Sequence, residues 1–83
     1  MKKNKLPTWF RGKCYTHGDK VTNRYSGESY ELTPEELSMY DFIVGTELVL
    51  GMGMRDDKMI EDMRKGLDWF RQHNAKAYMV LLD

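Results

Sequence analysis

The sequence predicts an α+β fold: a short three-stranded antiparallel meander packed on an antiparallel helical hairpin, with a short C-terminal helix. Residues 33–50 join a helix-start signal to an apolar run, and residues 56–73 repeat apolar residues at helical spacing. Residues 9–32 have the composition of strands separated by turn dipeptides. We expect residues 1–8 to be a flexible arm and residues 9–83 to be a single domain, near the lower size limit for folding alone.

The meander follows from aromatic and β-branched residues interrupted by Gly-Asp at 18–19 and Ser-Gly at 26–27. The predicted strands are Trp9–Thr16, Lys20–Tyr25 and Ser29–Leu32. Because a sheet this short is not stable alone, one of its faces must lie on the 33–50 helix. The side chains expected at that contact are Phe10, Val21, Tyr30 and Leu32.

The 33–50 segment is predicted to be the centre of the fold. Thr33 can cap the helix, Pro34 has a preset φ at the first helical position, and Glu36 can complete a capping box. The apolar side chains that follow point almost all round the helix axis. A helix of this kind must be enclosed on most sides.

The second helix begins after Gly51 and Gly53, which can stop the first helix and allow a return. Asp56 and Asp57 favour a helix start, since carboxylates stabilise the positive end of the dipole. The apolar stripe of this helix contains Met59, Ile60, Met63, Leu67 and Phe70.

Residues 75–82 are apolar at nearly every position, so their period does not decide between helix and strand. Asn74 can cap a helix, and we favour a short third helix. A final strand at the sheet edge stays open as the alternative.

Charge is balanced overall but not along the chain. Residues 1–32 hold seven basic and three acidic residues, and residues 33–83 hold six basic and ten acidic residues. This asymmetry fits either a basic surface for an acidic partner or attraction between the two halves. A lone cysteine, Cys14, and no export signal lead us to expect a reducing, cytoplasmic setting, and no apolar run is long enough to span a membrane.

Three segments carry a resemblance: LTPEELSMYDFIVG (32–45), RKGLDWF (64–70) and NAKAYMVLLD (74–83). In this order they resemble segments of small uncharacterised proteins of tailed phages that infect marine cyanobacteria. Ala75 departs from the group, which has proline directly after the asparagine. The resemblance implies a phage-encoded protein in the host cytoplasm, and it implies no activity.

No residue pattern indicates catalysis, a metal or a cofactor, and we expect a protein that is not an enzyme. Cys14 and His17 have the spacing of half a zinc site, but structural zinc needs four ligands. The only other imidazole is His73, in a distant part of the sequence. Cys14, His17 and Asp19 flank one predicted turn, without the oxyanion-binding loop that nucleophilic catalysis requires.

The leading hypothesis for function is a protein-binding adaptor or host-modulating protein, which binds another protein or a second copy of itself. The residues expected to contact the partner are Trp69, Met52, Met54 and Lys65. Trp69 lies off the apolar stripe of its helix, on the polar side with Lys65, and exposed tryptophans often anchor interfaces. Met52 and Met54 lie in a glycine-containing loop, where exposed apolar side chains suggest a contact. A second interpretation of Trp69 remains: residues 75–82 fold back and cover it.

The alternative function is binding of single-stranded nucleic acid through the meander. Aromatic rings that can stack on bases alternate there with basic residues that can bind phosphate. The residues expected to bind are Arg11, Lys13, Tyr15, Lys20, Arg24 and Tyr25. No motif typical of RNA-binding sheets accompanies them.

Overall fold

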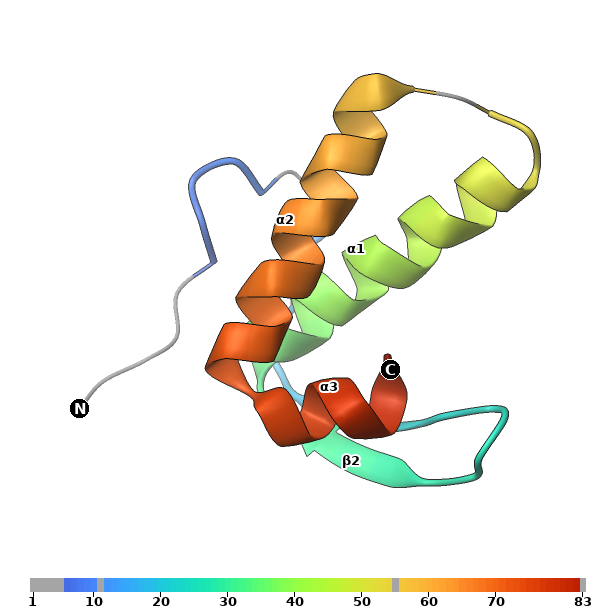
Figure 1. The fold of residues 1–83 in the computed structure, drawn as a ribbon. Coiled ribbons are helices and arrows are strands. Elements are labelled where there is room, and N and C mark those ends of the chain that lie inside the picture. The colour runs from blue at the N-terminus through green and yellow to red at the C-terminus, as the bar shows by residue number, and fades with distance from the viewer. Residues whose placement is uncertain (1–5, 11, 55, 83) are drawn as a thin grey trace.

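The computed structural model of the chain describes residues 6–10, 12–54 and 56–82. The elements in chain order are β1 (Asp19–Thr22), β2 (Ser29–Leu32), α1 (Pro34–Gly51), α2 (Asp57–His73) and α3 (Ala75–Leu81). The expected α+β class is therefore confirmed. Figure 1 shows α1 and α2 running in opposite directions and diverging toward the loop that joins them, whereas α3 and the strands lie at the other end.

The start of α1 is the predicted capping box. The Thr33 hydroxyl accepts a hydrogen bond from the Glu36 backbone N–H at 3.2 Å, and Glu36 Oε1 accepts one from the Thr33 N–H at 3.0 Å. At the other end, the Met52 N–H donates to the Leu48 carbonyl at 3.2 Å. Gly53 follows with φ +97, a conformation that glycine adopts without strain.

The starts of α2 and α3 are each capped by a side chain. Asp56 Oδ1 accepts a hydrogen bond from the Lys58 N–H at 2.9 Å at the start of α2. Asn74 Oδ1 accepts one from the Ala77 N–H at 3.1 Å at the start of α3, while the Asn74 N–H donates to the Phe70 carbonyl at 2.8 Å. The C-terminal segment is therefore the short helix that we favoured, and the alternative of a strand is wrong.

The sheet has two strands among the described residues, and the expected three-stranded meander is not found. β1 and β2 pair antiparallel, with Val21 opposite Tyr30. The described part of Trp9–Thr16 contains no strand. The Tyr15 N–H instead donates to the buried Ser38 hydroxyl of α1 at 2.9 Å, so a side chain satisfies a group that a third strand would pair.

The core lies where α1, α2, α3 and β2 meet. Its buried hydrophobic residues are Leu32, Met39, Ile43, Trp69, Phe70, Ala77 and Leu81. The four residues expected to contact α1 from the sheet region all belong to this core or pack against it, namely Phe10, Val21, Tyr30 and Leu32. Leu6 also packs against the core, so packing begins within the expected arm, whereas residues 1–5 lie outside the described residues.

The helices are close at Gly66 of α2. A Cβ atom there would lie 3.1 Å from Met39 Sδ and 3.3 Å from Ile43 Cγ1, so this glycine allows α1 and α2 to approach. Beyond this crossing the helices diverge (Figure 1). The expectation that α1 is enclosed along its length is wrong for its last turns: Thr46 is buried, but the Leu48 side chain is 66% exposed.

Candidate functional site

Trp69 does not offer a surface for a partner. It is 8% exposed and belongs to the hydrophobic core. Its indole ring stacks on the His73 imidazole at a centroid distance of 4.4 Å and meets Phe70 edge-on at 6.1 Å. The interpretation of Trp69 as an exposed contact residue is therefore wrong. Its burial fits the second interpretation, that the C-terminal segment covers it, because Ala77 and Leu81 of α3 belong to the same core cluster.

Lys65 lies apart from the methionine loop. Its ammonium group is 5.9 Å from the centre of the Trp9 ring and 4.0 Å from Glu61 Oε2. It is eight residues into α2, so it lies about 12 Å along the axis from the start of that helix. The sequence grouped Lys65 with Met52 and Met54 as contact residues, but the structure does not bring them together.

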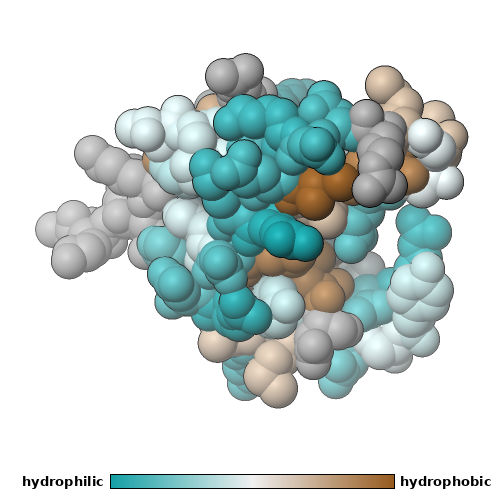
Figure 2. Space-filling view, turned by 45° about the horizontal axis from the view of Figure 1, so that its top comes forward, coloured by the Kyte–Doolittle hydropathy of each residue, from teal (hydrophilic) through white to brown (hydrophobic). Residues whose placement is uncertain are grey.

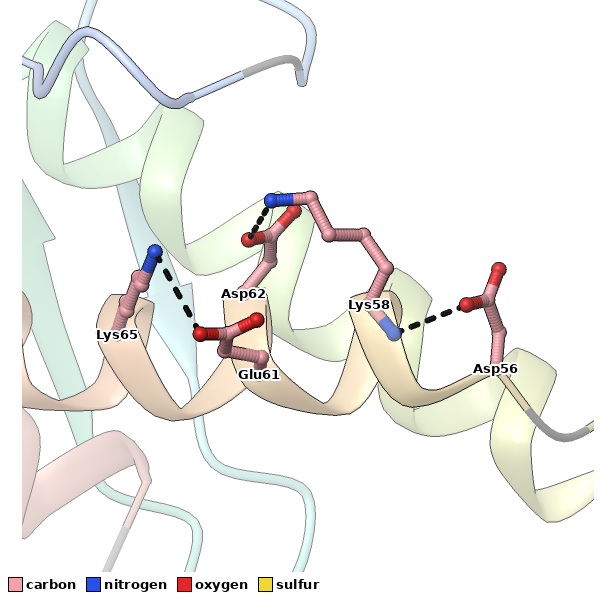
Figure 3. A network of polar contacts seen from close by, with 5 residues as sticks. All are labelled: Asp56, Lys58, Glu61, Asp62 and Lys65. Atoms are coloured by element: carbon pink, nitrogen blue, oxygen red, sulfur yellow. Dashed lines mark hydrogen bonds and ion pairs between the residues drawn. The ribbon is translucent and has the colours of Figure 1, made fainter.

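Two ion pairs lie along α2 (Figure 3). Lys58 Nζ lies 3.4 Å from Asp62 Oδ1, and Lys65 pairs with Glu61 one turn further on. The carboxyl oxygen of the largely buried Asp62 has this ion pair but no hydrogen bond. Surface pairs of this kind contribute about 0–1 kcal/mol each. The pair of Lys65 and Glu61 is exposed, whereas the pair of Lys58 and Asp62 is partly buried. We interpret both as pairs that stabilise α2 and not as a binding site.

Three of the five exposed large hydrophobic residues in the described part of the chain lie at the end of α1 and in the loop after it. The other two, Tyr25 and Met79, lie elsewhere. Leu48, Met52 and Met54 are 66%, 72% and 61% exposed. We call these three residues the α1 tip. Figure 2, which turns the upper end of Figure 1 toward the viewer, shows hydrophobic side chains gathered between hydrophilic ones. The sequence predicted that Met52 and Met54 are exposed. It also predicted that the 33–50 helix, which includes Leu48, is enclosed, because no sequence pattern shows where α2 diverges from α1.

A hollow of about 470 Å³ lies beside the α1 tip. Its walls are the turn after β1, one side of α1, and the end of α3. We call it the turn pocket, and its lining residues are Thr22, Asn23, Arg24, Tyr25, Tyr40, Val44, Glu47, Leu48, Leu81 and Leu82. Sequence reasoning missed it, since residues from three distant segments form it.

Tyr40 lines the turn pocket together with two opposite charges, those of Arg24 and Glu47. Burial raises the pKa of its phenol above the ordinary 10.0. The positive charge of Arg24 lowers that pKa, and the negative charge of Glu47 raises it. Both charged groups therefore lie within electrostatic reach of the phenol.

The residues expected to bind nucleic acid are dispersed. Lys13 lies over the Tyr15 ring at 5.3 Å in an irregular segment, and Lys20 lies on β1. Arg24 and Tyr25 belong to the turn pocket. Arg11 lies outside the described residues. The three-stranded meander that was expected to carry these residues is not found among the described residues.

Cys14 and His17 are both exposed. His17 Nδ1 lies 3.0 Å from the Thr16 hydroxyl, and Cys14 Sγ lies 4.0 Å from the Gly12 carbonyl. Within residues 6–10, 12–54 and 56–82, no three histidine, cysteine or carboxylate side chains group as metal ligands would. None of the helices in these ranges has the length and hydropathy needed to cross a membrane.

Comparison with known proteins gives no relative for this chain: no family model, curated protein or solved structure matches it. The two features available are the apolar α1 tip and the turn pocket beside it.

Proposed function

We propose that this chain is a small, non-enzymatic protein-binding protein that contacts its partner through the α1 tip. The observation that carries the proposal is the exposure of Leu48, Met52 and Met54 together. Grouped exposed apolar side chains are typical of interaction sites. Methionine side chains also adapt their shape to a partner, because they are unbranched and polarisable.

The energy available at the α1 tip is consistent with a specific contact. Burying a leucine or methionine side chain contributes about 1.5–3 kcal/mol. Three such side chains therefore contribute roughly 5–9 kcal/mol before the entropic cost of association, which is of similar size. We infer that the tip is an anchor within a larger interface.

The experiment compares the wild-type chain with a triple variant, Leu48→Ser, Met52→Ser and Met54→Ser. The resemblance implies a phage protein in the cytoplasm of a marine cyanobacterium. Tagged protein is therefore used to capture partners from an extract of such a host cell. A protein retained by the wild type and lost by the triple variant supports the proposal. Sedimentation of the purified chain tests whether the partner is a second copy.

Met79 provides a matched control. It is 66% exposed, like Leu48, but lies on α3 outside the α1 tip. Met79→Ser should retain every partner that the wild type captures. If it loses the same partners as the triple variant, the contact does not belong to the α1 tip.

Nucleic-acid binding is the second candidate, and one observation favours it. The Tyr25 ring is 90% exposed and follows Arg24 directly, so a base could stack there beside a phosphate contact. Titration of a fluorescent single-stranded oligonucleotide at 50 and at about 200 mM salt tests this candidate. Affinity that falls steeply with salt and is lost in Tyr25→Ser supports it; absence of binding removes it.

A further inference from the structure

The turn pocket is held in shape by Asn23. Its side-chain amide donates to the Val80 carbonyl of α3 at 2.9 Å. Its side-chain oxygen accepts from the Tyr25 and Ser26 backbone N–H groups at 2.8 and 3.3 Å. One side chain thus shapes the turn and joins it to α3. The wall that carries Arg24 is therefore fixed in place before any ligand arrives.

The size of the pocket suits a small molecule. Its volume of about 470 Å³ falls within the roughly 300–1,000 Å³ common for ligand sites. The apolar part of the lining comes from two helices, with Val44 and Leu48 on α1 and Leu81 at the end of α3. These side chains offer a surface to an apolar group of the ligand.

Three polar groups in the pocket have no partner among the described residues. Within the part of the chain that the structure describes, Arg24 and Glu47 form no ion pair, although they carry opposite charges beside the same phenol. The Tyr40 hydroxyl likewise makes no hydrogen bond there. The pocket therefore offers a cation, an anion and a neutral hydroxyl above an apolar surface.

A ligand with one charge matches this arrangement poorly. An apolar carboxylate would pair with Arg24 but be repelled by Glu47, and an apolar amine would meet the reverse problem. A molecule that carries both charges can pair with both residues. Its carboxylate can bind the planar guanidinium of Arg24, and its ammonium can bind the Glu47 carboxylate. The free α-amino acids with apolar side chains have this combination of groups.

We propose that the turn pocket binds a free α-amino acid with an aliphatic or aromatic side chain, with its carboxylate at Arg24 and its ammonium at Glu47. The Tyr40 hydroxyl donates a further hydrogen bond to the carboxylate. The apolar side chain lies against Val44 and Leu81. This proposal does not depend on partner binding at the α1 tip.

The test is an NMR titration of the full ¹⁵N-labelled chain with L-leucine and with L-phenylalanine. Saturable shifts should centre on the amides of the turn after β1 and of the pocket side of α1. 3-Phenylpropionate and phenethylamine, which each carry one charge, should bind at least about fivefold more weakly than L-phenylalanine, as expected for loss of one exposed ion pair.

Variants assign the two charges. Arg24→Gln and Glu47→Gln should each weaken amino-acid binding about fivefold. Both residues are exposed, so neither change should unfold the chain. The matched controls are Lys20→Gln and Asp41→Asn, which remove exposed charges of the same signs outside the pocket and should leave binding unchanged. Absence of saturable shifts, or equal binding by a singly charged compound, would overturn the proposal.

Discussion

Glu36 and Asn74 join the first helix to the last. Glu36 is 4% exposed, and its Oε2 accepts a hydrogen bond from Asn74 Nδ2 at 3.0 Å, although the residues are 38 positions apart. The other oxygen of Glu36 completes the capping box of α1, while the side-chain oxygen of Asn74 caps α3. Two polar side chains thus fix the starts of α1 and α3 relative to one another.

Replacing Asn74 with alanine should lower the free energy of unfolding by about 2–3 kcal/mol. Loss of the α3 cap accounts for about 1 kcal/mol, and the buried Glu36 oxygen left without its donor accounts for the rest. Urea denaturation followed by circular dichroism measures the change. Gln72→Ala, at an exposed position in the last turn of α2, is the control and should change stability by less than about 0.5 kcal/mol. Equal stability of the two variants would contradict this role for Asn74.

Two helical glycines should respond in opposite ways to alanine. Gly45→Ala should stabilise the chain by about 0.5–1 kcal/mol, because alanine favours helix and nothing lies within 4 Å of the new Cβ. Gly66→Ala should destabilise it by about 1 kcal/mol, since Met39 and Ile43 are fully buried and cannot move away from the new methyl group. Thermal denaturation of both variants measures the difference. If both are stabilising, the helices are less closely packed at Gly66 than described.

Trp69→Ala should destabilise the chain by about 3–5 kcal/mol, which is the usual cost of removing a buried tryptophan. For a domain of this size such a loss can remove the folded state, so Trp69→Phe is tested beside it and should retain the fold with a smaller loss. The measurement is denaturant unfolding, followed by circular dichroism. A stable Trp69→Ala variant with altered association would mean that Trp69 is a surface anchor after all.

The phenol of Tyr40 should make stability depend on pH in the alkaline range. Because its pKa is higher in the folded chain than in the unfolded chain, the folded state holds this proton more tightly. The resulting stabilisation is complete below pH 10.0 and is lost as the pH rises through the folded-state value. Denaturation at several pH values should show this fall for the wild type and a smaller one for Tyr40→Phe.

The opposite charges of Arg24 and Glu47 should shift the titration of Tyr40 in opposite directions. Arg24→Gln removes the positive charge and should raise the pKa of Tyr40, whereas Glu47→Gln should lower it. NMR of chain with ¹³C-labelled tyrosine rings reports the titration of Tyr40 separately from the others. Shifts of the same sign in both variants would place at least one of these charges away from the pocket.

Helix boundaries were predictable because local chemistry determines them. The capping box at Thr33 and the cap at Asn74 each depend on side chains within three residues of the helix start. The strand predicted over Trp9–Thr16 does not form among the described residues. The aromatic residues of this segment pack on a helix instead, since the Phe10 and Trp9 rings both lie against Phe42 of α1. Composition alone does not separate a strand from a segment whose rings pack on a helix.

The candidate site was predictable only in part. Met52 and Met54 are in a loop, and their exposure follows from local sequence. The burial of Trp69 and the exposure of Leu48 depend on where other elements pack and where α2 diverges from α1, which helical periodicity does not encode. The turn pocket was missed for the same reason, since its walls are brought together only by the tertiary fold.

The central claim is that the α1 tip is exposed to solvent in the free chain and is available to a partner. Its direct test is solvent paramagnetic relaxation of ¹³C-labelled methionine and leucine methyl groups, at a concentration where sedimentation shows a monomer. Strong enhancement is expected at Leu48, Met52 and Met54, with Met39 protected because it is fully buried. Protection of the three tip methyl groups to the level of Met39 would contradict the claim.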